Sequence, residues 1–330
     1  MRITNRMMSN TYLSNMNRNL SNLNKINNQL STGKLINRPS DNPYKTARSM
    51  QLTTSINTNS QYKSNINNAS NWLDATDDAL SSLTNVLQRV RELMISSGNA
   101  AYGSDESASI NKEINERVSE VTQILNSNFD GRYIFGGTKT TSKPLDVAQN
   151  PVTKNYDIKF IDKEGNHIDL ESAEIDQVRL VDSLSSNLSV EVSKGVNIDY
   201  NVTAMGILRF KSDAGESIDG IALLSDIQNN LSSNSVDDRE KVVTENLKDI
   251  DALLSNILNK RAEVGAKQNR MESALSKNED ETLSMTDVLS KTEDVDYTEK
   301  TIEYYMAQTT YTAALQVNAQ VLPKTILDYL

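Results

Sequence analysis

The sequence predicts an α+β fold: a long antiparallel α-helical coiled-coil bundle made by the N- and C-terminal segments, with an inserted small β-rich domain. In both halves of the chain, apolar residues recur at alternating three- and four-residue steps, the pattern of helices that pack on a partner helix. Between about residues 138 and 235 the apolar period shortens to two, as in strands. Ten of the 12 glycines also lie between Gly98 and Gly220. The ends are therefore regular and the middle is irregular.

These changes of pattern divide the 330 residues into five predicted segments. The first and last, 1–43 and 291–330, are expected to be assembly helices that are disordered in the monomer. Residues 44–137 are expected to form a long helical hairpin and a β-hairpin of a core rod, and residues 236–290 a long helix that returns along it. Residues 138–235 are expected to form an inserted β-rich domain.

The stretch Ser31–Pro43, STGKLINRPSDNP, predicts a short corner between the first two helices. Pro39 is expected to push Arg38 out of helical conformation and so to close the first helix. Ser40 or Asp41 can cap the second helix, and Pro43 falls in its first turn, where a missing N–H costs little. The predicted helix corner is Pro39, Ser40, Asp41 and Pro43.

The N-terminal segment carries only a narrow apolar stripe, the predicted N-terminal assembly seam. Its residues are Leu13, Met16, Leu20, Leu23 and Leu30, with Asn27 in the slot that breaks the series. So thin a stripe buries too little surface to offset the entropy of ordering, and we expect this helix to order only against a partner. The alternative is an ordinary solvated helix packed on its own domain.

From Tyr44 to about Ser97 the heptad pattern predicts one helix of some fifty residues, about 75 to 80 Å long at 1.5 Å per residue. Its inward positions are Ile66, Ala69, Leu73, Thr76, Leu80, Leu83, Leu87, Val90 and Met94. A loop is expected over Gly98–Asp105 and a second helix over Asn111–Asn126, facing inward with Ile110, Ile114, Val118, Val121 and Leu125. Phe129–Gly137 then predicts a short β-hairpin, since no phosphate-loop motif is present.

In the middle segment, apolar residues alternate with polar ones in several short runs. Tyr156, Ile158 and Phe160 precede a KEGN turn at Lys163–Asn166, after which Ile168 and Leu170 resume the alternation. Further candidate strands contain Val178 with Leu180, Val190 with Val192, Ile198 with Tyr200 and Val202, and Ile207 with Phe210. Residues Ile221–Leu231 are expected to add a short helix.

The longest heptad series begins at Val243 and predicts a helix that runs against the Tyr44–Ser97 helix. It comprises Val243, Leu247, Ile250, Leu254, Ile257, Arg261, Val264, Gln268, Met271 and Leu275. Arg261 and Gln268 are polar intrusions that we expect to fix the register of the two helices. The predicted core-rod residues are Leu73, Leu80, Leu87, Leu247, Leu254 and Arg261.

Asp296-Tyr-Thr-Glu299 is a capping-box start for a last helix. Its predicted C-terminal assembly seam is Ile302, Met306, Ala313 and Val317, again a thin stripe. Because the chain reverses through the inserted domain, we expect the two weak terminal helices to meet and form one coiled coil.

Composition excludes several classes of function. The net charge of −10 and the absence of a basic run argue against nucleic-acid binding. With no cysteine and one histidine, His167, common nucleophile–base pairs and transition-metal sites are not available, so we expect no enzyme and no cofactor. No apolar run is long enough to span a membrane, and the N-terminus lacks the core of a cleaved secretion signal.

Three kinds of residue that could suggest a site are assigned structural roles. The acidic runs Asp77-Asp78 and Glu279–Glu281 are interpreted as solvated helix faces or loops, and no Ca²⁺-loop pattern is present. His167 is expected to be a solvated imidazole near a turn. Trp72, beside Leu73, is expected to pack in the core.

Four stretches, matching in order, carry a resemblance to a known family. They are MRIT with Ser31–Lys34 and Pro39–Pro43, then Gly131–Gly136, then Arg261–Gly265 with Asn269–Ser273, and finally Asp294–Asp296 leading to Leu327–Leu330. In these stretches the chain resembles the hook-associated protein 3 family, the hook–filament junction proteins of the bacterial flagellin superfamily. The inserted middle carries no match, and in this family that part varies freely.

The resemblance implies a structural axial protein of the bacterial flagellum, an adaptor ring between hook and filament, located outside the cell. It implies flagellar type III export without a cleaved signal. The implied partners are other copies in a ring, the preceding hook-associated protein, flagellin and an export chaperone, with no nucleic acid and no membrane. Flagellin itself is the alternative family, although the PSDNP corner and the RYIFGG hairpin differ from its usual pattern. A secreted coiled-coil adhesin fits the composition but not the four motifs.

Overall fold

The computed structural model describes residues 5–98, 104–150, 155–170, 174–212, 215–233 and 235–321. Contacts divide the chain into two compact units. The terminal unit comprises residues 1–60 and 279–330, and the central unit residues 61–278. The division falls inside two long helices, α2 (Pro43–Ser97) and α8 (Glu245–Glu293).

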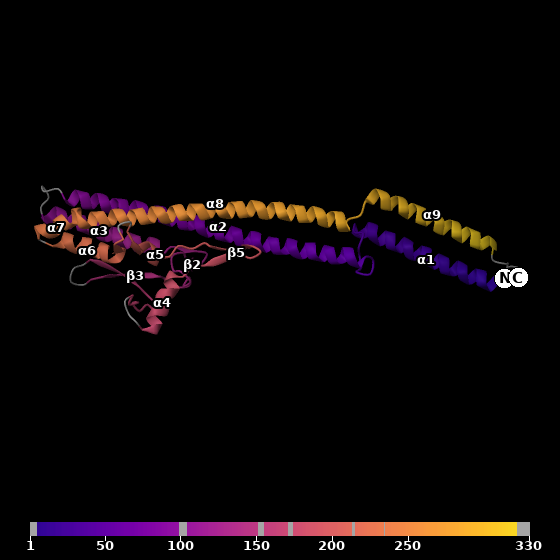
Figure 1. Ribbon diagram of the computed structural model, residues 1–330, viewed down its shortest axis with the longest axis horizontal. Coiled ribbons are helices and arrows are strands. Elements are labelled where there is room, and N and C mark those ends of the chain that lie inside the picture. Colours follow the sequence, from indigo (N-terminus) through magenta and orange to yellow (C-terminus); the bar gives the residue numbers. More distant parts are fainter. Residues whose placement is uncertain are drawn as a thin grey trace. The chain divides into compact units, whose positions relative to one another are not determined.

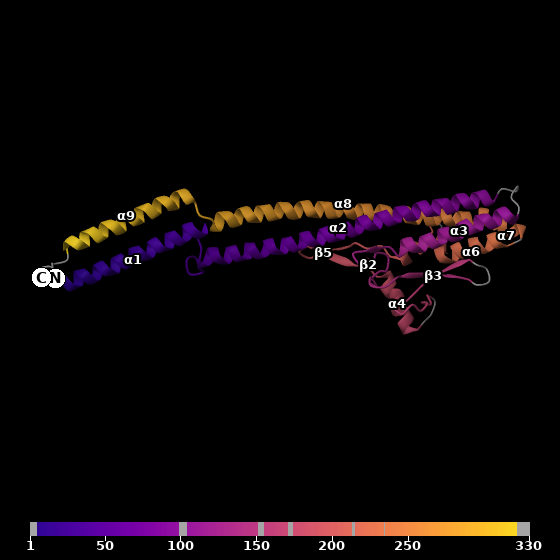
Figure 2. The ribbon, with the colours of Figure 1, turned by 180° about the vertical axis from the view of Figure 1, so that it is seen from behind.

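The terminal unit contains α1 (Asn5–Thr32), the first part of α2, the last part of α8, and α9 (Tyr297–Val321). Helices α1 and α9 lie side by side (Figures 1 and 2). They run in opposite directions, because Tyr12 contacts Ala314 near one end of the pair, and Gly33 contacts Val295 near the other. The predicted pairing of the two terminal helices is therefore found within the chain.

The central unit is built on α2 and α8. It confirms the heptad series predicted for α2 between Ile66 and Met94 and, for α8, the part of the series from Ile250 to Met271, whereas Val243, the first residue of that series, lies in a separate helix. All nine inward positions predicted between Ile66 and Met94 are buried, each at most 3% exposed. On α8 the apolar positions from Ile250 to Met271 are buried as well. The pairs Arg91–Asp251 and Asp77–Arg261 show that the two helices are antiparallel. Helix α8 begins at Glu245, after a short separate helix, α7 (Val236–Val243).

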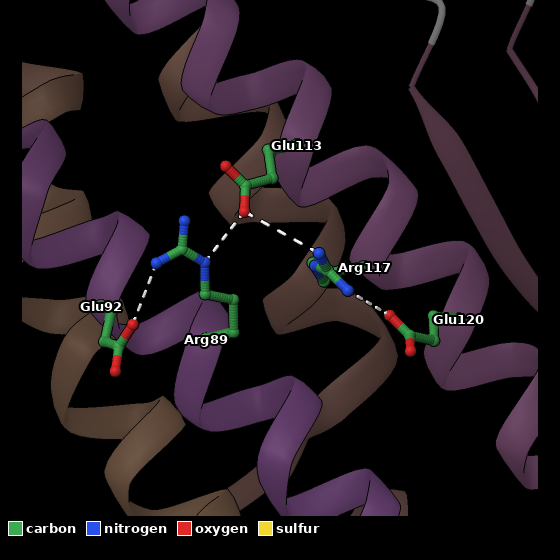
Figure 3. A network of polar contacts seen from close by, with 5 residues as sticks. All are labelled: Arg89, Glu92, Glu113, Arg117 and Glu120. Carbon is green, nitrogen blue, oxygen red and sulfur yellow. Dashed lines mark hydrogen bonds and ion pairs between the residues drawn. The ribbon is translucent and has the colours of Figure 1, made fainter.

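Helix α3 (Ser104–Leu125) packs its predicted apolar face inward and is linked to α2 by a charged network (Figure 3). The guanidinium of Arg89 on α2 donates to Glu92 at 3.1 Å and to Glu113 of α3 at 2.9 Å. The hydrogen bond to Glu113, together with that to Glu92, raises the pKa of Arg89. On α3 itself, Arg117 donates to Glu120 at 2.6 Å.

The described residues in the middle of the chain form four separate two-stranded antiparallel ribbons. These are β1 (Asn128–Phe129) with β2 (Arg132–Tyr133), β3 (Leu145–Gln149) with β4 (Tyr156–Phe160), β5 (Ser189–Ser193) with β6 (Val196–Asp199), and β7 (Arg209–Lys211) with β8 (Ser217–Asp219). The hairpin predicted within Phe129–Gly137 is present, turning at Asp130 and Gly131, which both have positive φ. It begins one residue earlier, at Asn128.

Several predicted strands are wrong because short helices occupy those positions. Val178 and Leu180 lie in α4 (Ile175–Ser185), and Ile207 lies in α5 (Ala204–Leu208). Ile168 and Leu170 form no strand, although an isolated bridge joins Ile161 to His167. The helix expected over Ile221–Leu231 is confirmed as α6 (Gly220–Ser232). The insertion is thus a mixed α and β region.

One contiguous hydrophobic core runs from Ile66 to Met271, entirely within the central unit. It joins the seams of α2, α3 and α8 to apolar residues of the inserted region, such as Phe135, Leu145 and Phe160. Isolated two-stranded ribbons are marginally stable in water, so packing on the helices stabilises them. Trp72 is buried as predicted, with its ring edge-to-face against Phe129 at 6.3 Å and Tyr200 at 5.9 Å between centroids.

Candidate assembly interface

The two helices of the terminal unit meet along partly buried faces. On α1 the partly buried positions include Tyr12, Met16, Asn19, Leu23, Ile26 and Leu30, and on α9 they are Lys300, Glu303, Tyr304, Ala307, Tyr311 and Ala314. The hydroxyl of Tyr12 donates to the carbonyl of Ala314 at 2.5 Å. A groove of about 540 Å³, lined by Asn19, Ile26, Gln29, Lys300 and Ala307 among others, runs between the helices.

Three of the five residues of the predicted N-terminal assembly seam lie on the partly buried side of α1, and their role in assembly stays a prediction. Met16, Leu23 and Leu30, spaced by seven, are partly buried. Leu13 and Leu20 are 52% and 39% exposed, so they lie on the outer side of that line. On a helix, the residues three and four positions before Met16, Leu23 or Leu30 lie on opposite sides of the line that joins these three residues. The sequence prediction placed the seam on the side of Leu13 and Leu20. The partly buried side instead carries Tyr12, Asn19 and Ile26.

The predicted C-terminal seam is not the face of α9 that lies against α1. Ile302, Met306 and Val317 are each more than half exposed, and Ala313 is exposed too. Met306 reaches the rim of the groove but stays 66% exposed. Apolar side chains occur all round α9, so spacing could not select the packed face. A role for these four residues in contacts with other molecules stays a prediction.

At the helix corner, two predictions are wrong: the residue that ends the first helix and the residue that caps the second. Helix α1 ends at Thr32, and Gly33 follows with a φ of +71°, the left-handed conformation that commonly terminates helices at glycine. Pro39 therefore does not close this helix. Pro43 is the first residue of α2, as predicted, but the side chain of Asn42 is the one that accepts from the Lys45 N–H at 3.1 Å.

The predicted cap residue Asp41 stabilises the preceding turn instead. Its Oδ2 accepts from the backbone N–H groups of Asn37 and Arg38, and its Oδ1 pairs with Lys25 of α1 at 3.2 Å. Ser40 is exposed and makes no described side-chain bond. The hydrogen bond from Lys25, with that from Arg38, lowers the pKa of Asp41.

A cluster that the sequence did not reveal joins the corner to the link between α8 and α9. The Leu35 N–H donates to the Glu293 carbonyl at 2.6 Å, and the Val295 N–H donates to the Gly33 carbonyl at 3.0 Å. The Glu293 carboxylate accepts from Lys34 Nζ and from Ser49 Oγ, each at 2.5 Å. We call these residues, Gly33, Lys34, Leu35, Ser49, Glu293 and Val295, the corner clasp.

Glu293 holds the corner clasp together as a carboxylate. Burial raises the pKa of Glu293, but the hydrogen bonds from Lys34 and Ser49 outweigh burial, and the net pKa lies below the ordinary value. After the clasp, Asp296 caps α9 by accepting from the Thr298 N–H at 2.9 Å and the Glu299 N–H at 3.3 Å. That start of the last helix was predicted correctly.

The contact between α1 and α9 is thin. Among the residues of these two helices whose burial the structure describes, only Gln29 is buried, with its amide donating to the Leu35 carbonyl at 2.7 Å. Helix α2, in contrast, is buried throughout its heptad series in the central unit. The disorder of residues 1–43 and 291–330 in the isolated chain stays a prediction.

The predicted core-rod residues lie together along α2 and α8. Leu73, Leu80 and Leu87 are 0–1% exposed, Leu254 is buried, and Leu247 is partly buried. Arg261 donates to both oxygens of Asp77, and Gln268 donates to Asp74 at 2.7 Å. Asp77, expected to be a solvated acid, is thus the partner of the polar intrusion at Arg261.

None of the described helices is both long enough and apolar enough to cross a membrane. Within the same residues there is no cluster of three or more His, Cys, Asp or Glu side chains that could hold a metal ion.

Comparison with known proteins places this architecture in a family. Residues 3–140 match the model of the bacterial flagellin N-terminal helical region, and residues 247–330 match that of the C-terminal helical region. The chain is 25% identical to flagellar hook-associated protein 3 of Salmonella typhimurium over 327 residues, covering 96% of this chain and 95% of that protein. It is also 25% identical to flagellin of Bacillus subtilis, over 92% of this chain and 90% of that protein.

The fold is also similar to solved structures. The crystal structure of flagellar hook-associated protein 3 from Legionella pneumophila aligns with a TM-score of 0.57 at 15% identity, covering 73% of this chain and 98% of that chain. With family models that match both helical ends, and with similarity to hook-associated protein 3 along nearly its whole length, this chain belongs to the bacterial flagellin family of structural flagellar proteins.

Proposed function

We propose that this protein is a structural adaptor of the bacterial flagellum that joins the hook to the filament and assembles through its terminal helices. The observation that carries the proposal is the contrast between the two units. The contiguous hydrophobic core lies within the central unit, whereas α1 and α9 bury little and leave large apolar side chains exposed. Such helices gain most of their stability when neighbouring molecules cover them.

Assembly into a ring fits this arrangement. The exposed apolar residues include Met7, Leu13, Leu20, Ile302, Tyr305, Met306 and Val317, all on the two terminal helices. Head-to-tail contacts between identical molecules give rings or helical tubes, and long helices can line them. The expected neighbours are other copies of the chain, the preceding hook-associated protein and flagellin, and a chaperone is expected to hold the C-terminal helix before export.

The placement outside the cell, at the hook–filament junction, rests on the similarity to hook-associated protein 3. Passage through the flagellar export channel requires an unfolded chain, and a protein without cysteines needs no oxidative folding at its destination. We propose that the N-terminal segment guides export without being cleaved.

The second candidate is a filament subunit, which the comparable identity to the Bacillus subtilis flagellin favours. Seeded assembly separates the two. Purified chain is added to hook fragments and, separately, to filament seeds, and the products are measured by electron microscopy. An adaptor adds a short zone of fixed length to hook ends, which then accepts flagellin. Tubes that keep lengthening with added chain would support the filament subunit and contradict the adaptor.

A matched control in the same reaction lacks residues 296–330. It retains the central unit and should add nothing to hook ends. If the truncated chain forms the same zone as the full chain, the terminal helices are not the assembly interface.

A further inference from the structure

The two ends of the chain carry opposite net charges of equal size. Residues 1–60, which we call the basic arm, contain eight lysines and arginines and the single carboxylate Asp41, a net charge of +7. Residues 279–330, the acidic arm, contain ten carboxylates and three lysines, a net charge of −7. The whole chain has a net charge of −10, so the basic arm differs strongly from the rest of the molecule.

Much of this charge is left over after the ion pairs described within the terminal unit. Lys34 and Glu293 join the two arms at 2.5 Å. Lys25 pairs with Asp41 inside the basic arm, and Lys291 and Lys300 pair with Asp287 and Glu303 inside the acidic arm. Pairs within one arm leave the charge difference between the arms unchanged.

Exposed side chains carry part of the remaining charge on both arms. Arg18, Arg38 and Arg48 of the basic arm are exposed, and their guanidinium groups make no ion pair or hydrogen bond with any residue that the structure describes. The same holds, within the described ranges, for the carboxylates of Asp280 and Glu299 on the acidic arm. Each arm therefore offers groups of one sign to solvent.

Large apolar side chains are exposed on the same two arms. Tyr44 and Met50 of the basic arm are 82% and 66% exposed, and Leu283 and Tyr297 of the acidic arm are 72% and 58% exposed. Apolar residues rimmed by charged ones are typical of a protein–protein contact. Two surfaces of opposite sign, each with apolar residues, complement each other.

We propose that the basic arm of one copy docks on the acidic arm of a second copy. This inference rests on the proposed function and names the surface through which neighbouring copies recognise each other. Each copy carries one arm of each sign, so every contact leaves one basic and one acidic arm unused, and the series continues around a ring. Arms of like sign repel, which excludes the wrong pairing and steers the right one.

The test uses two charge-reversed full-length chains. In the first, Arg38→Glu and Arg48→Glu make the basic arm less basic, and in the second, Asp280→Lys and Glu299→Lys make the acidic arm less acidic. Circular dichroism first checks that both keep the helix content of the parent chain. Sedimentation velocity at about 50 mM salt, where the screening length is about 14 Å, then measures self-association.

Each variant alone is expected to self-associate at least about tenfold more weakly than the parent chain. An equimolar mixture is expected to recover association between unlike copies, because the unaltered acidic arm of the first variant, with a net charge of −7, meets the unaltered basic arm of the second, with a net charge of +7. Neither variant alone can form this contact, since each carries only one unaltered arm. Raising the salt concentration tenfold should weaken association of the parent chain.

The matched control reverses an exposed ion pair of the central unit, Arg179→Glu with Asp176→Lys, and should associate like the parent. The proposal is overturned if the parent chain stays monomeric at all concentrations, if the single variants associate normally, or if the mixture is no better than its parts. The seeded-assembly experiment tests the adaptor function separately. Tubes that keep lengthening there would contradict the adaptor function but would leave the pairing of basic and acidic arms intact.

Discussion

Arg261 of α8 donates two hydrogen bonds to Asp77 of α2, from Nε to Oδ1 at 3.0 Å and from Nη2 to Oδ2 at 3.4 Å. The hydrogen bond to Asp77 raises the pKa of Arg261. Arg261 occupies a position of the heptad series where an apolar residue would be usual. A two-pronged contact of this kind holds the helices in one alignment more specifically than apolar packing alone does.

We predict that Arg261→Leu shifts the alignment of α2 and α8 and lowers the free energy of unfolding only slightly. Both side chains are about one third exposed, so a double-mutant cycle with Asp77→Asn should give a coupling of only about 0.5 to 1 kcal/mol, reduced by salt. Chemical denaturation measures this coupling. The more exposed pair Arg91–Asp251 is the control and should couple more weakly.

Alignment itself is read from disulfide trapping, since the chain has no native cysteine. Cysteine pairs placed at matching and at offset positions of α2 and α8 should give one dominant pair in the parent and a spread in Arg261→Leu. The same single dominant pair in both proteins would leave the register hypothesis without support.

The core packing of the central unit predicts that Leu80→Ala strongly lowers the free energy of unfolding. Leu80 is fully buried, and removing it leaves a cavity, so the free energy of unfolding should fall by about 2 to 5 kcal/mol. Leu258→Ala on α8 is the matched control, because Leu258 is 50% exposed, and its loss should stay below about 1 kcal/mol. Urea denaturation measures both. Equal losses would mean that the packing described for α2 is wrong.

Substitution by alanine is expected to have opposite effects on stability at two glycines, Gly33 and Gly265. Gly33 has a φ of +71°, and a Cβ there would lie 2.8 Å from the Tyr297 hydroxyl, so Gly33→Ala should destabilise the corner by about 1 to 2 kcal/mol. Gly265 lies inside α8, where a Cβ would lie 4.0 Å from Gln268 Oε1, so Gly265→Ala should raise the free energy of unfolding by about 0.5 to 1 kcal/mol.

Hydrogen exchange of the Val295 amide reports on the corner, and urea denaturation reports on α8. Faster exchange is expected in Gly33→Ala, and a higher urea midpoint in Gly265→Ala. A Gly33→Ala chain with unchanged exchange would contradict the left-handed helix stop.

The corner clasp predicts a loss of stability in acid. The folded pKa of Glu293 lies below its unfolded value, so the clasp contributes its full stability above the unfolded value near 4.5. That contribution is lost as the pH falls through the lower, folded pKa. Carboxyl NMR should show Glu293 titrating at a lower pH in the folded chain than in the urea-unfolded chain, and Glu293→Gln should remove this part of the acid sensitivity. Titration of Glu293 at a higher pH in the folded chain than in the unfolded chain would contradict the contacts with Lys34 and Ser49.

Removal of residues 1–30 or 296–330 should leave a folded, soluble monomer that cannot assemble. The hydrophobic core begins at Ile66 and ends at Met271, so neither deletion removes a core residue. Circular dichroism and sedimentation measure folding and association. Loss of cooperative unfolding in either truncated chain would show that the central unit depends on the arms.

The sequence was sufficient for the long helices but not for the faces of the terminal ones. Between Ile66 and Met94 the heptad positions were all buried, because a dense apolar core leaves one face of α2 as its only possible inward side. In α9 the same reasoning selected Ile302 and Met306, which are exposed. Apolar residues surround this helix, so its packed face depends on α1 and not on its own spacing.

Contacts between segments that are distant in the sequence could not be predicted from local sequence patterns either. Nothing near Glu293 indicates that Lys34 and Ser49 will reach it, because these residues meet only when the corner and the α8–α9 link come together. In the middle segment, Val178 and Leu180 alternate as in a strand but lie in a helix. A pattern of two apolar residues is too short to separate a period of 2 from one of 3.6.

Within the residues that the structure describes, every strand of the four ribbons pairs only with the other strand of its own ribbon. Hydrogen bonds between strands therefore do not link one ribbon to the next. A change in the strand pairing of one ribbon leaves the pairing of the other ribbons intact, although apolar residues such as Leu145 of β3 and Phe160 of β4 also belong to the shared hydrophobic core.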